Sequence, residues 1–209
     1  MKVILVILMI LMRAVLSANE TISYFNHYDK IESVELSDKG EIRISSKQIK
    51  RFIVSDSVKR IKSISLSFTV LEAPNILSIF ENCEYLELFT THSIDYTFLR
   101  SLTKLKTLWI EGDNLNNRII DLRNCPEIEQ LSFTNCKLKD LGNVLGINKN
   151  IKLVCLFANT FYQVPIELFK INPNVVIVLV ANKSVEKIDM GNIYYDYNKL
   201  PNEYKLLLP

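Results

Sequence analysis

The sequence predicts an α/β solenoid, in which short parallel strands stack into a curved sheet and short helices or 3-10 turns return the chain. Three observations predict this fold class. In Ile128–Leu138, apolar residues stand at offsets one, four, six and eleven, with Cys136 at offset nine. The same pattern returns along the chain in steps of 22, 22, 22, 23, 23 and 24 residues. All fourteen residues at offsets four and six are apolar. A repeat that buries its apolar side only against its neighbours explains all three observations.

Seven units share this frame, and the offset-one residues are Lys39, Ile61, Cys83, Leu105, Ile128, Ile151 and Val175. Offsets four and six are Ile42 and Ile44, Ile64 and Leu66, Leu86 and Leu88, Leu108 and Ile110, Leu131 and Phe133, Val154 and Leu156, Val178 and Val180. Side chains alternate across a strand, so offsets four and six share the core face, and offsets three, five, seven and eight are predicted to face away from it. Parallel strands about 4.8 Å apart would then form a continuous sheet.

This pattern resembles the leucine-rich repeat, a strand followed by a turn that Asn or Cys closes, over about Lys39–Val185. Asn is usual at offset nine in that family; this chain has Lys47, Thr69, Thr91, Asp113, Cys136, Asn159 and Lys183 there. The sixth return arc, Val164-Pro165-x-x-x-Phe169, also resembles the family. Apolar spacing predicts short helices or 3-10 turns on the convex side at 56–58, 75–81 and 96–102.

Segments outside the repeats have distinct compositions. Residues 1–18 combine Lys2, an apolar run and small residues, which is typical of a secretory signal peptide. Residues 19–38 are predicted to cap the solenoid, with Ile31–Leu36 and Ile42–Ile44 pairing as a hairpin across a turn that contains Gly40. Residues 186–209 form a Tyr-rich tail, with Leu206–Leu208 as a truncated last strand.

If the chain is exported, its two N-glycosylation triplets predict glycans on Asn19 and Asn182. We expect a secreted, extracellular protein with no stable membrane span after signal cleavage, because the apolar run is shorter than the roughly 20 residues that a spanning helix needs. Without Lys2 and Arg13 of the leader, 23 basic residues balance 23 acidic ones. This neutrality argues against nucleic acid as a partner, since phosphate binding needs a basic surface.

The chain offers little for catalysis, and we expect no enzyme activity and no cofactor. The two histidines, His27 and His92, belong to no metal-spaced cluster, and no phosphate-binding glycine loop or nucleophile motif is present. Cys83, Cys125 and Cys136 occupy positions typical of buried thiols. Cys155, at offset five, is expected to face solvent without any group that would lower its pKa.

The concave face is the predicted binding surface. Phe68, Tyr85, Phe89 and Trp109 converge there, away from either end, and aromatic side chains of this kind form binding hot spots. Phe157 of the sixth repeat is a fifth predicted binding residue. Leu153, Cys155, Ile177 and Leu179 either extend that surface or lie beneath the tail. If Trp109 is exposed, Trp109→Ala should weaken partner capture and leave thermal melting nearly unchanged.

The resemblance implies a secreted, non-enzymatic module that presents its concave face to a protein partner. A second hypothesis is a self-associating structural or surface-coat protein, in which exposed edges pair into a homo-oligomer. A third is a host–pathogen or immune recognition factor, a role that no particular residue selects. The identity of the partner stays open at this stage.

Overall fold

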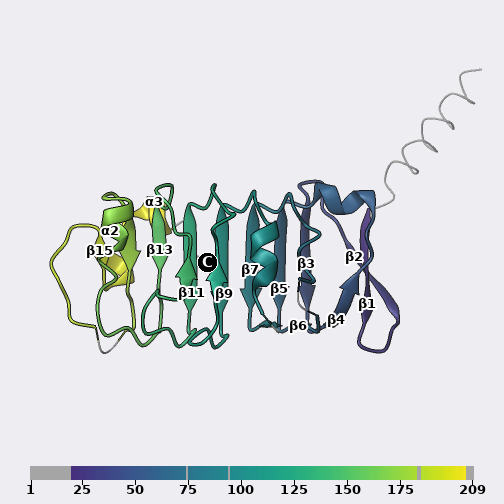
Figure 1. Ribbon diagram of the computed structural model, residues 1–209, viewed down its shortest axis with the longest axis horizontal. Coiled ribbons are helices and arrows are strands. Elements are labelled where there is room, and N and C mark those ends of the chain that lie inside the picture. The colour runs from purple at the N-terminus through teal and green to yellow at the C-terminus, as the bar shows by residue number, and fades with distance from the viewer. Residues whose placement is uncertain (1–19, 74, 94, 183–184, 206–209) are drawn as a thin grey trace, which may run out of the picture.

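A parallel sheet dominates the fold. The computed structural model describes residues 20–73, 75–93, 95–182 and 185–205. The predicted signal peptide, Asn19 and Leu206–Leu208 lie outside these ranges. Eight strands run side by side in the order β15-β14-β13-β11-β9-β7-β5-β3, with their axes parallel (Figure 1). They are β3 (Glu41–Ser45), β5 (Ser63–Ser67), β7 (Tyr85–Phe89), β9 (Thr107–Glu111), β11 (Gln130–Thr134), β13 (Leu153–Cys155), β14 (Val176–Val178) and β15 (Ile193–Tyr194). The structure confirms the leucine-rich-repeat solenoid.

The first six repeats stack in the predicted register. Ile42 pairs with Ile64, which pairs with Leu86, and the same row continues strand by strand to Val154. The twelve residues at offsets four and six of these repeats are all buried in the core behind the sheet. Each strand inside the sheet therefore satisfies its backbone and buries its apolar row only because a neighbour lies on either side, whereas β3 at the end pairs with β5 alone.

The predicted frame of the seventh repeat was wrong by one residue. Ile177, not Val178, pairs with Val154, so Ile177 and Leu179 belong to the core behind the sheet. Val176 and Val178 face the other way. A shift of one residue moves every side chain of a strand to the opposite face, which is why the prediction placed Ile177 and Leu179 on the wrong surface.

Offset eight carries a backbone requirement that the sequence pattern does not reveal. In all seven repeats the residue there has a left-handed φ: Ser46, Phe68, Thr90, Gly112, Asn135, Ala158 and Ala181, with φ between 47° and 75°. Only Gly and Asn adopt this conformation at little cost. The turn after the strand is therefore imposed by stacking rather than by local preference.

Offset nine links each repeat to the one before it. Asn159 accepts hydrogen bonds from the backbone N–H groups of Cys136 and Leu138, at 2.9 and 3.1 Å, and its Nδ2 donates to the carbonyl oxygens of Phe133 and Phe157. The Thr91 hydroxyl donates to Leu66 O at 2.9 Å, and the Cys136 thiol donates to Ile110 O.

Asn182, not Lys183, is the offset-nine residue of the seventh repeat. Its Nδ2 donates to the carbonyl oxygen of Leu156, and its side chain is buried. The same nitrogen also donates to Val180 O. The glycosylation predicted for Asn182 stays a prediction.

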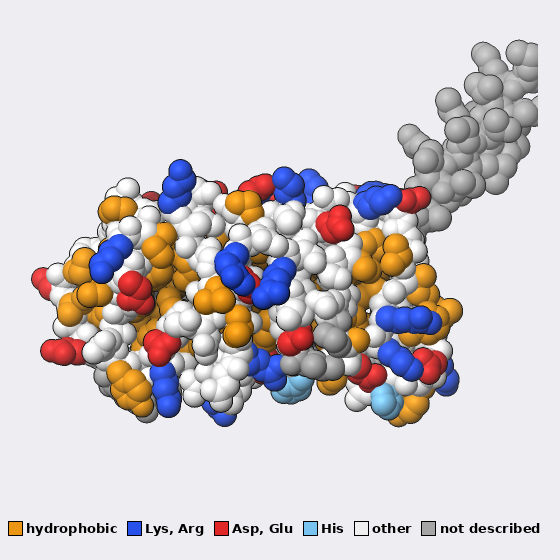
Figure 2. Space-filling view, in the orientation of Figure 1, with side chains coloured by type: hydrophobic (Ala, Val, Ile, Leu, Met, Phe, Trp, Pro, Cys, Tyr) orange, Lys and Arg blue, Asp and Glu red, His pale blue; other side chains and the backbone are white. Residues whose placement is uncertain are grey.

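The convex side carries short elements. The 3-10 helices predicted at 56–58 and 96–102 are present, residues 75–79 form turns, and the short strands were not predicted. The elements are the strands β4 (Gln48–Phe52), β6 (Val70–Leu71), β8 (His92–Ser93), β10 (Ile120–Asp121) and β12 (Val144–Leu145), the 3-10 helices η1 (Asp56–Arg60) and η2 (Thr97–Ser101), and the helix α2 (Leu168–Ile171). On the face with η2, basic and acidic side chains are interspersed (Figure 2). No helix within the described ranges is long and apolar enough to cross a membrane.

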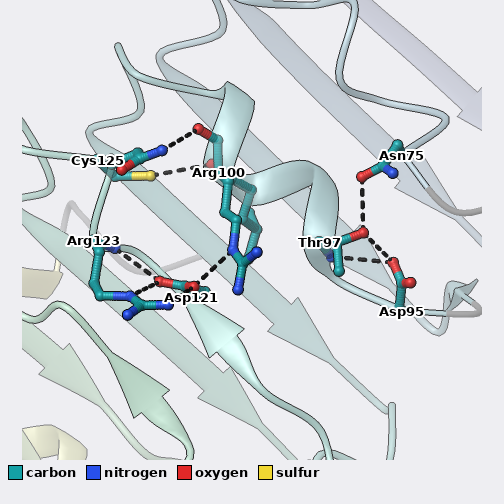
Figure 3. Close-up of polar contacts among 9 residues, drawn as sticks. Asn75, Asp95, Thr97, Arg100, Asp121, Arg123 and Cys125 are labelled. Carbon is teal, nitrogen blue, oxygen red and sulfur yellow. Dashed lines mark hydrogen bonds and ion pairs between the residues drawn. The ribbon is translucent and has the colours of Figure 1, made fainter.

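One buried carboxylate joins two convex arcs. The Asp121 carboxylate accepts hydrogen bonds from Arg100 Nε at 2.7 Å and from Arg123 Nε and Nη2 at 2.8 and 2.6 Å (Figure 3). Hydrogen bonds from Arg123, ahead of those from Arg100, hold the pKa of Asp121 below its usual range. Both guanidinium groups are thus committed to the scaffold.

The N-terminal cap uses a different strand pair from the predicted one. β2 (Ile31–Glu35) pairs antiparallel with β1 (Thr21–Asn26), whereas β3 pairs with β5 in the repeat sheet. The turn before β3 exists, since Gly40 N donates to Ser37 O at 2.9 Å, but it carries the chain from one sheet to the other. β3 joins the repeats because Ile42 and Ile44 find a matching apolar row in β5.

The tail begins with an earlier eighth strand than predicted. β15 pairs with β14, and the chain then forms η3 (Tyr197–Lys199) and α3 (Asn202–Lys205). Leu200 is buried against Leu153 and Val176, on the face opposite the main core. The tail therefore folds back over the C-terminal part of the sheet.

We expect Asn159→Ala to lower the free energy of unfolding by at least about 2 kcal/mol, because it leaves two backbone N–H groups and two carbonyls in the interior without this partner. Chemical denaturation would measure the change. Asn117→Ala, at an exposed position, is the control and should change the free energy of unfolding by less than about 0.5 kcal/mol. Equal effects of the two substitutions would contradict a structural role for the offset-nine amide.

Candidate functional site

The concave face is the surface formed by offsets three, five and seven of the parallel strands. Strand pairing places these residues in three rows. Across β7, β9, β11 and β13 the rows are Tyr85, Thr107, Gln130 and Leu153; Glu87, Trp109, Ser132 and Cys155; and Phe89, Glu111, Thr134 and Phe157. The first half of this surface is aromatic and acidic, the middle is polar, and the last part is apolar.

Phe68 and Phe89 form an aromatic pair, in which Phe68 is exposed and Phe89 is half-buried. Their ring centroids lie 5.1 Å apart with an interplanar angle of 88°, an edge-to-face arrangement. Phe68 directly follows β5 and has a left-handed φ. It is 56% exposed. Tyr85 lies on the same strand as Phe89 and is half-buried; burial, then the charge of Glu87, raises the pKa of Tyr85 to about 12. The structure thus brings together Phe68 and Phe89, whereas Tyr85 lies at the other end of β7.

Trp109 is buried, so its predicted exposure was wrong. Only 8% of the residue is accessible, and its indole Nε1 has no hydrogen-bond partner. Trp109 lines a hollow of about 300 Å³ together with Glu111, Ser132, Thr134, Phe157, Ala158 and Tyr197. Tyr197 comes from η3, and its ring centroid lies 6.4 Å from that of Phe157. Strand alternation could not reveal this cover, because it arrives from a distant part of the chain.

Burial changes the expected effect of Trp109→Ala. Removing a buried tryptophan side chain costs roughly 3–5 kcal/mol in other proteins. The substitution is therefore expected to lower the melting temperature, and it no longer separates binding from folding. Exposed Phe68 serves that purpose better.

Two carboxylates flank Trp109. Glu87 lies beside it on β7, and Glu111 follows two residues later on β9. Ser65 Oγ donates to Glu87 Oε2 at 2.5 Å. Neither carboxylate takes part in an ion pair with a described residue. Burial, and then the charge of Glu87, raises the pKa of Glu111.

The C-terminal part of the concave face is covered. Leu153, Cys155, Val176 and Val178 form an apolar cluster with Leu200, and Tyr204 of α3 packs against it. The predicted exposure of Cys155 was therefore wrong, and burial raises the pKa of its thiol. The tail covers this region, although it covers Val176 and Val178 rather than Ile177 and Leu179.

The four cysteines are buried and free. Burial raises the pKa of Cys83 and Cys136 to about 12 and that of Cys125 to about 11. Thiols of this kind are rarely ionised at neutral pH and react poorly. Among the described residues, no group of three or more His, Cys, Asp or Glu side chains is placed to hold a metal ion.

Comparison with known proteins agrees with the fold class. No protein-family model matches the chain, and no curated protein matches it. Among solved structures, the chain is similar to internalin C2 from Listeria monocytogenes strain 4b F2365, with 16% identity and a TM-score of 0.50 over 78% of this chain and 83% of that one. Internalin inlF of the same strain aligns with 15% identity and a TM-score of 0.49 over 85% of this chain. The aligned part is 56% of the length of inlF. At such identities the likeness concerns the fold alone.

We expect Glu111→Gln to raise the melting temperature at neutral pH. The pKa of Glu111 is higher in the folded state, so folding is disfavoured by its charge once the pH exceeds that pKa. The gain should disappear below about pH 4, where the carboxyl is protonated in both states. Thermal melts across this pH range would measure it, with exposed Glu81→Gln as the control. A lower melting temperature for Glu111→Gln at pH 7 would contradict the expectation.

Proposed function

We propose that the chain is a secreted, non-enzymatic module that binds a protein partner through the open part of its concave face. The pair of exposed Phe68 and half-buried Phe89 carries this proposal, with Tyr85 at the other end of β7. Large aromatic side chains gain affinity by excluding water and contribute much of the binding energy in protein interfaces. Secretion is supported by the composition of residues 1–18.

The scaffold supports binding without rearrangement. The aromatic pair lies at the ends of β5 and β7, two strands held on both sides by further strands of the sheet. Neighbouring offset-nine side chains, Thr69 and Thr91, tie the turns after these strands to the previous repeats. A preorganised surface loses little conformational entropy when a partner binds. The fold can therefore present Phe68 and Phe89 rigidly.

We expect Phe68→Ser to abolish or strongly weaken partner capture and to leave the melting temperature within about 2 °C, because the side chain is mostly in solvent. Affinity capture with the secreted protein, followed by mass spectrometry, would measure the first effect and a thermal melt the second.

The matched control is Ile119→Ser, which removes an apolar side chain of similar exposure, 59%, outside the concave face. It should preserve capture. Capture that survives Phe68→Ser but is lost with Ile119→Ser would move the binding surface away from the concave face and overturn the proposal.

A further inference from the structure

Trp109 lines the hollow, and its buried indole Nε1 is a hydrogen-bond donor with no acceptor among the described residues. The residue is more than nine-tenths buried, and Nε1 has no partner. Buried donors are almost always paired in native proteins, because an unpaired one loses its hydrogen bond to water and gains nothing in return. An acceptor that entered the hollow would recover this loss.

Negative charge borders the same hollow. Glu111 is one of its lining residues, and Glu87 lies beside Trp109 on the neighbouring strand. The two carboxylates repel each other, as the effect of Glu87 on Glu111 shows. Arg43 is two strands from Glu87 in the same row, beyond Ser65, and its charge acts on Tyr85. A cation on the ligand would relieve the repulsion at close range.

The opposite wall of the hollow is apolar. Phe157 and Tyr197 provide two aromatic rings, and Ala158 adds a methyl group. The volume of about 300 Å³ is at the lower end of the range for small-molecule sites and suits one or two side chains. The surface continues from Glu87 along β7 to Phe89, so an extended ligand can contact both regions.

We propose, on the basis of the proposed function, that this hollow binds a polypeptide segment with a Lys or Arg side chain next to a large apolar side chain. The cation lies between Glu87 and Glu111, and the apolar side chain packs on Phe157 and Tyr197. A backbone carbonyl of the segment accepts a hydrogen bond from Trp109 Nε1. Because Nε1 is shielded from solvent, part of its cover shifts as the carbonyl enters.

Trp109 is the only tryptophan in the chain, so intrinsic fluorescence reports directly on this site. The full chain would be titrated with a synthetic Gly-Leu-Lys-Leu-Gly peptide, blocked at both ends. Two control peptides replace the Lys by Glu or both Leu residues by Gly. We expect a saturable change in emission with the first peptide and at least tenfold weaker binding of both controls.

Variants test the assigned roles. Glu87→Gln and Glu111→Gln should each weaken binding of the Lys peptide by about tenfold, because each removes a charge-assisted contact. Glu81→Gln, an exposed carboxylate elsewhere, should not change it. Phe157→Leu should weaken binding and keep the charge preference. Equal affinity for the Lys and Glu peptides, or unchanged binding by both Gln variants, would overturn the proposal.

Two further outcomes are informative. A fluorescence response that appears only after residues 206–209 are removed would assign the hollow to the chain's own C-terminal segment and overturn the proposal. Absence of any peptide response, with partner capture still sensitive to Phe68→Ser, would overturn the proposal and leave the proposed function standing. If Phe68→Ser also preserved capture, the proposed function would fail independently.

Discussion

The structure depends on stacking repeats in register. A single five-residue strand such as β9 satisfies its backbone only through β7 and β11, and it buries Leu108 and Ile110 only against neighbouring repeats. The offset-nine side chain adds a second link, because Asn159 bonds backbone groups of the preceding turn. This requirement is strong enough to hold Ala158 and Thr90 in a left-handed conformation that each would otherwise avoid. The direction of every side chain on the concave face follows from it.

Most of this fold could be predicted because alternation in the first six repeats distinguishes the two faces. The seventh repeat failed for a physical reason: residues 175–180 are all apolar, so alternation cannot tell one face from the other. Both faces of β14 are in fact buried, by the core on one side and the tail on the other. The turn after this strand distinguishes the two frames. Asn is the usual residue at offset nine, and this chain has Asn at position 182 and Lys at position 183. The predicted N-terminal hairpin was wrong for another reason. β1, in which Ile22 and Tyr24 are buried in alternation, is a competing partner for β2.

The residues of the candidate site also differ in how well the sequence predicts their environment. Phe68, Tyr85 and Phe89 could be placed from their offsets, because they lie on β7 or directly after β5. The environment of Trp109 and Cys155 could not, because it depends on Tyr197 and Leu200 returning from beyond the last repeat. A local pattern gives the direction of a side chain, but its exposure also depends on contacts that the pattern does not include. The offsets therefore predict the face on which a side chain lies, but not whether that side chain is accessible to solvent.

The position of the hollow has a physical explanation. Val176 and Val178 would leave an exposed apolar patch at the end of the sheet, and the tail removes it by packing Leu200 and Tyr204 over them. Tyr197, at the margin of this cover, reaches Phe157 and closes one side of the hollow, and beyond it the surface changes from apolar to acidic. A ligand at this boundary can bury apolar area against the tail and place a charge beside Glu111 in the same contact. Neither the fully covered part nor the open part of the concave face offers both. The tail that caps the solenoid therefore also forms one side of the hollow that we propose as a binding site.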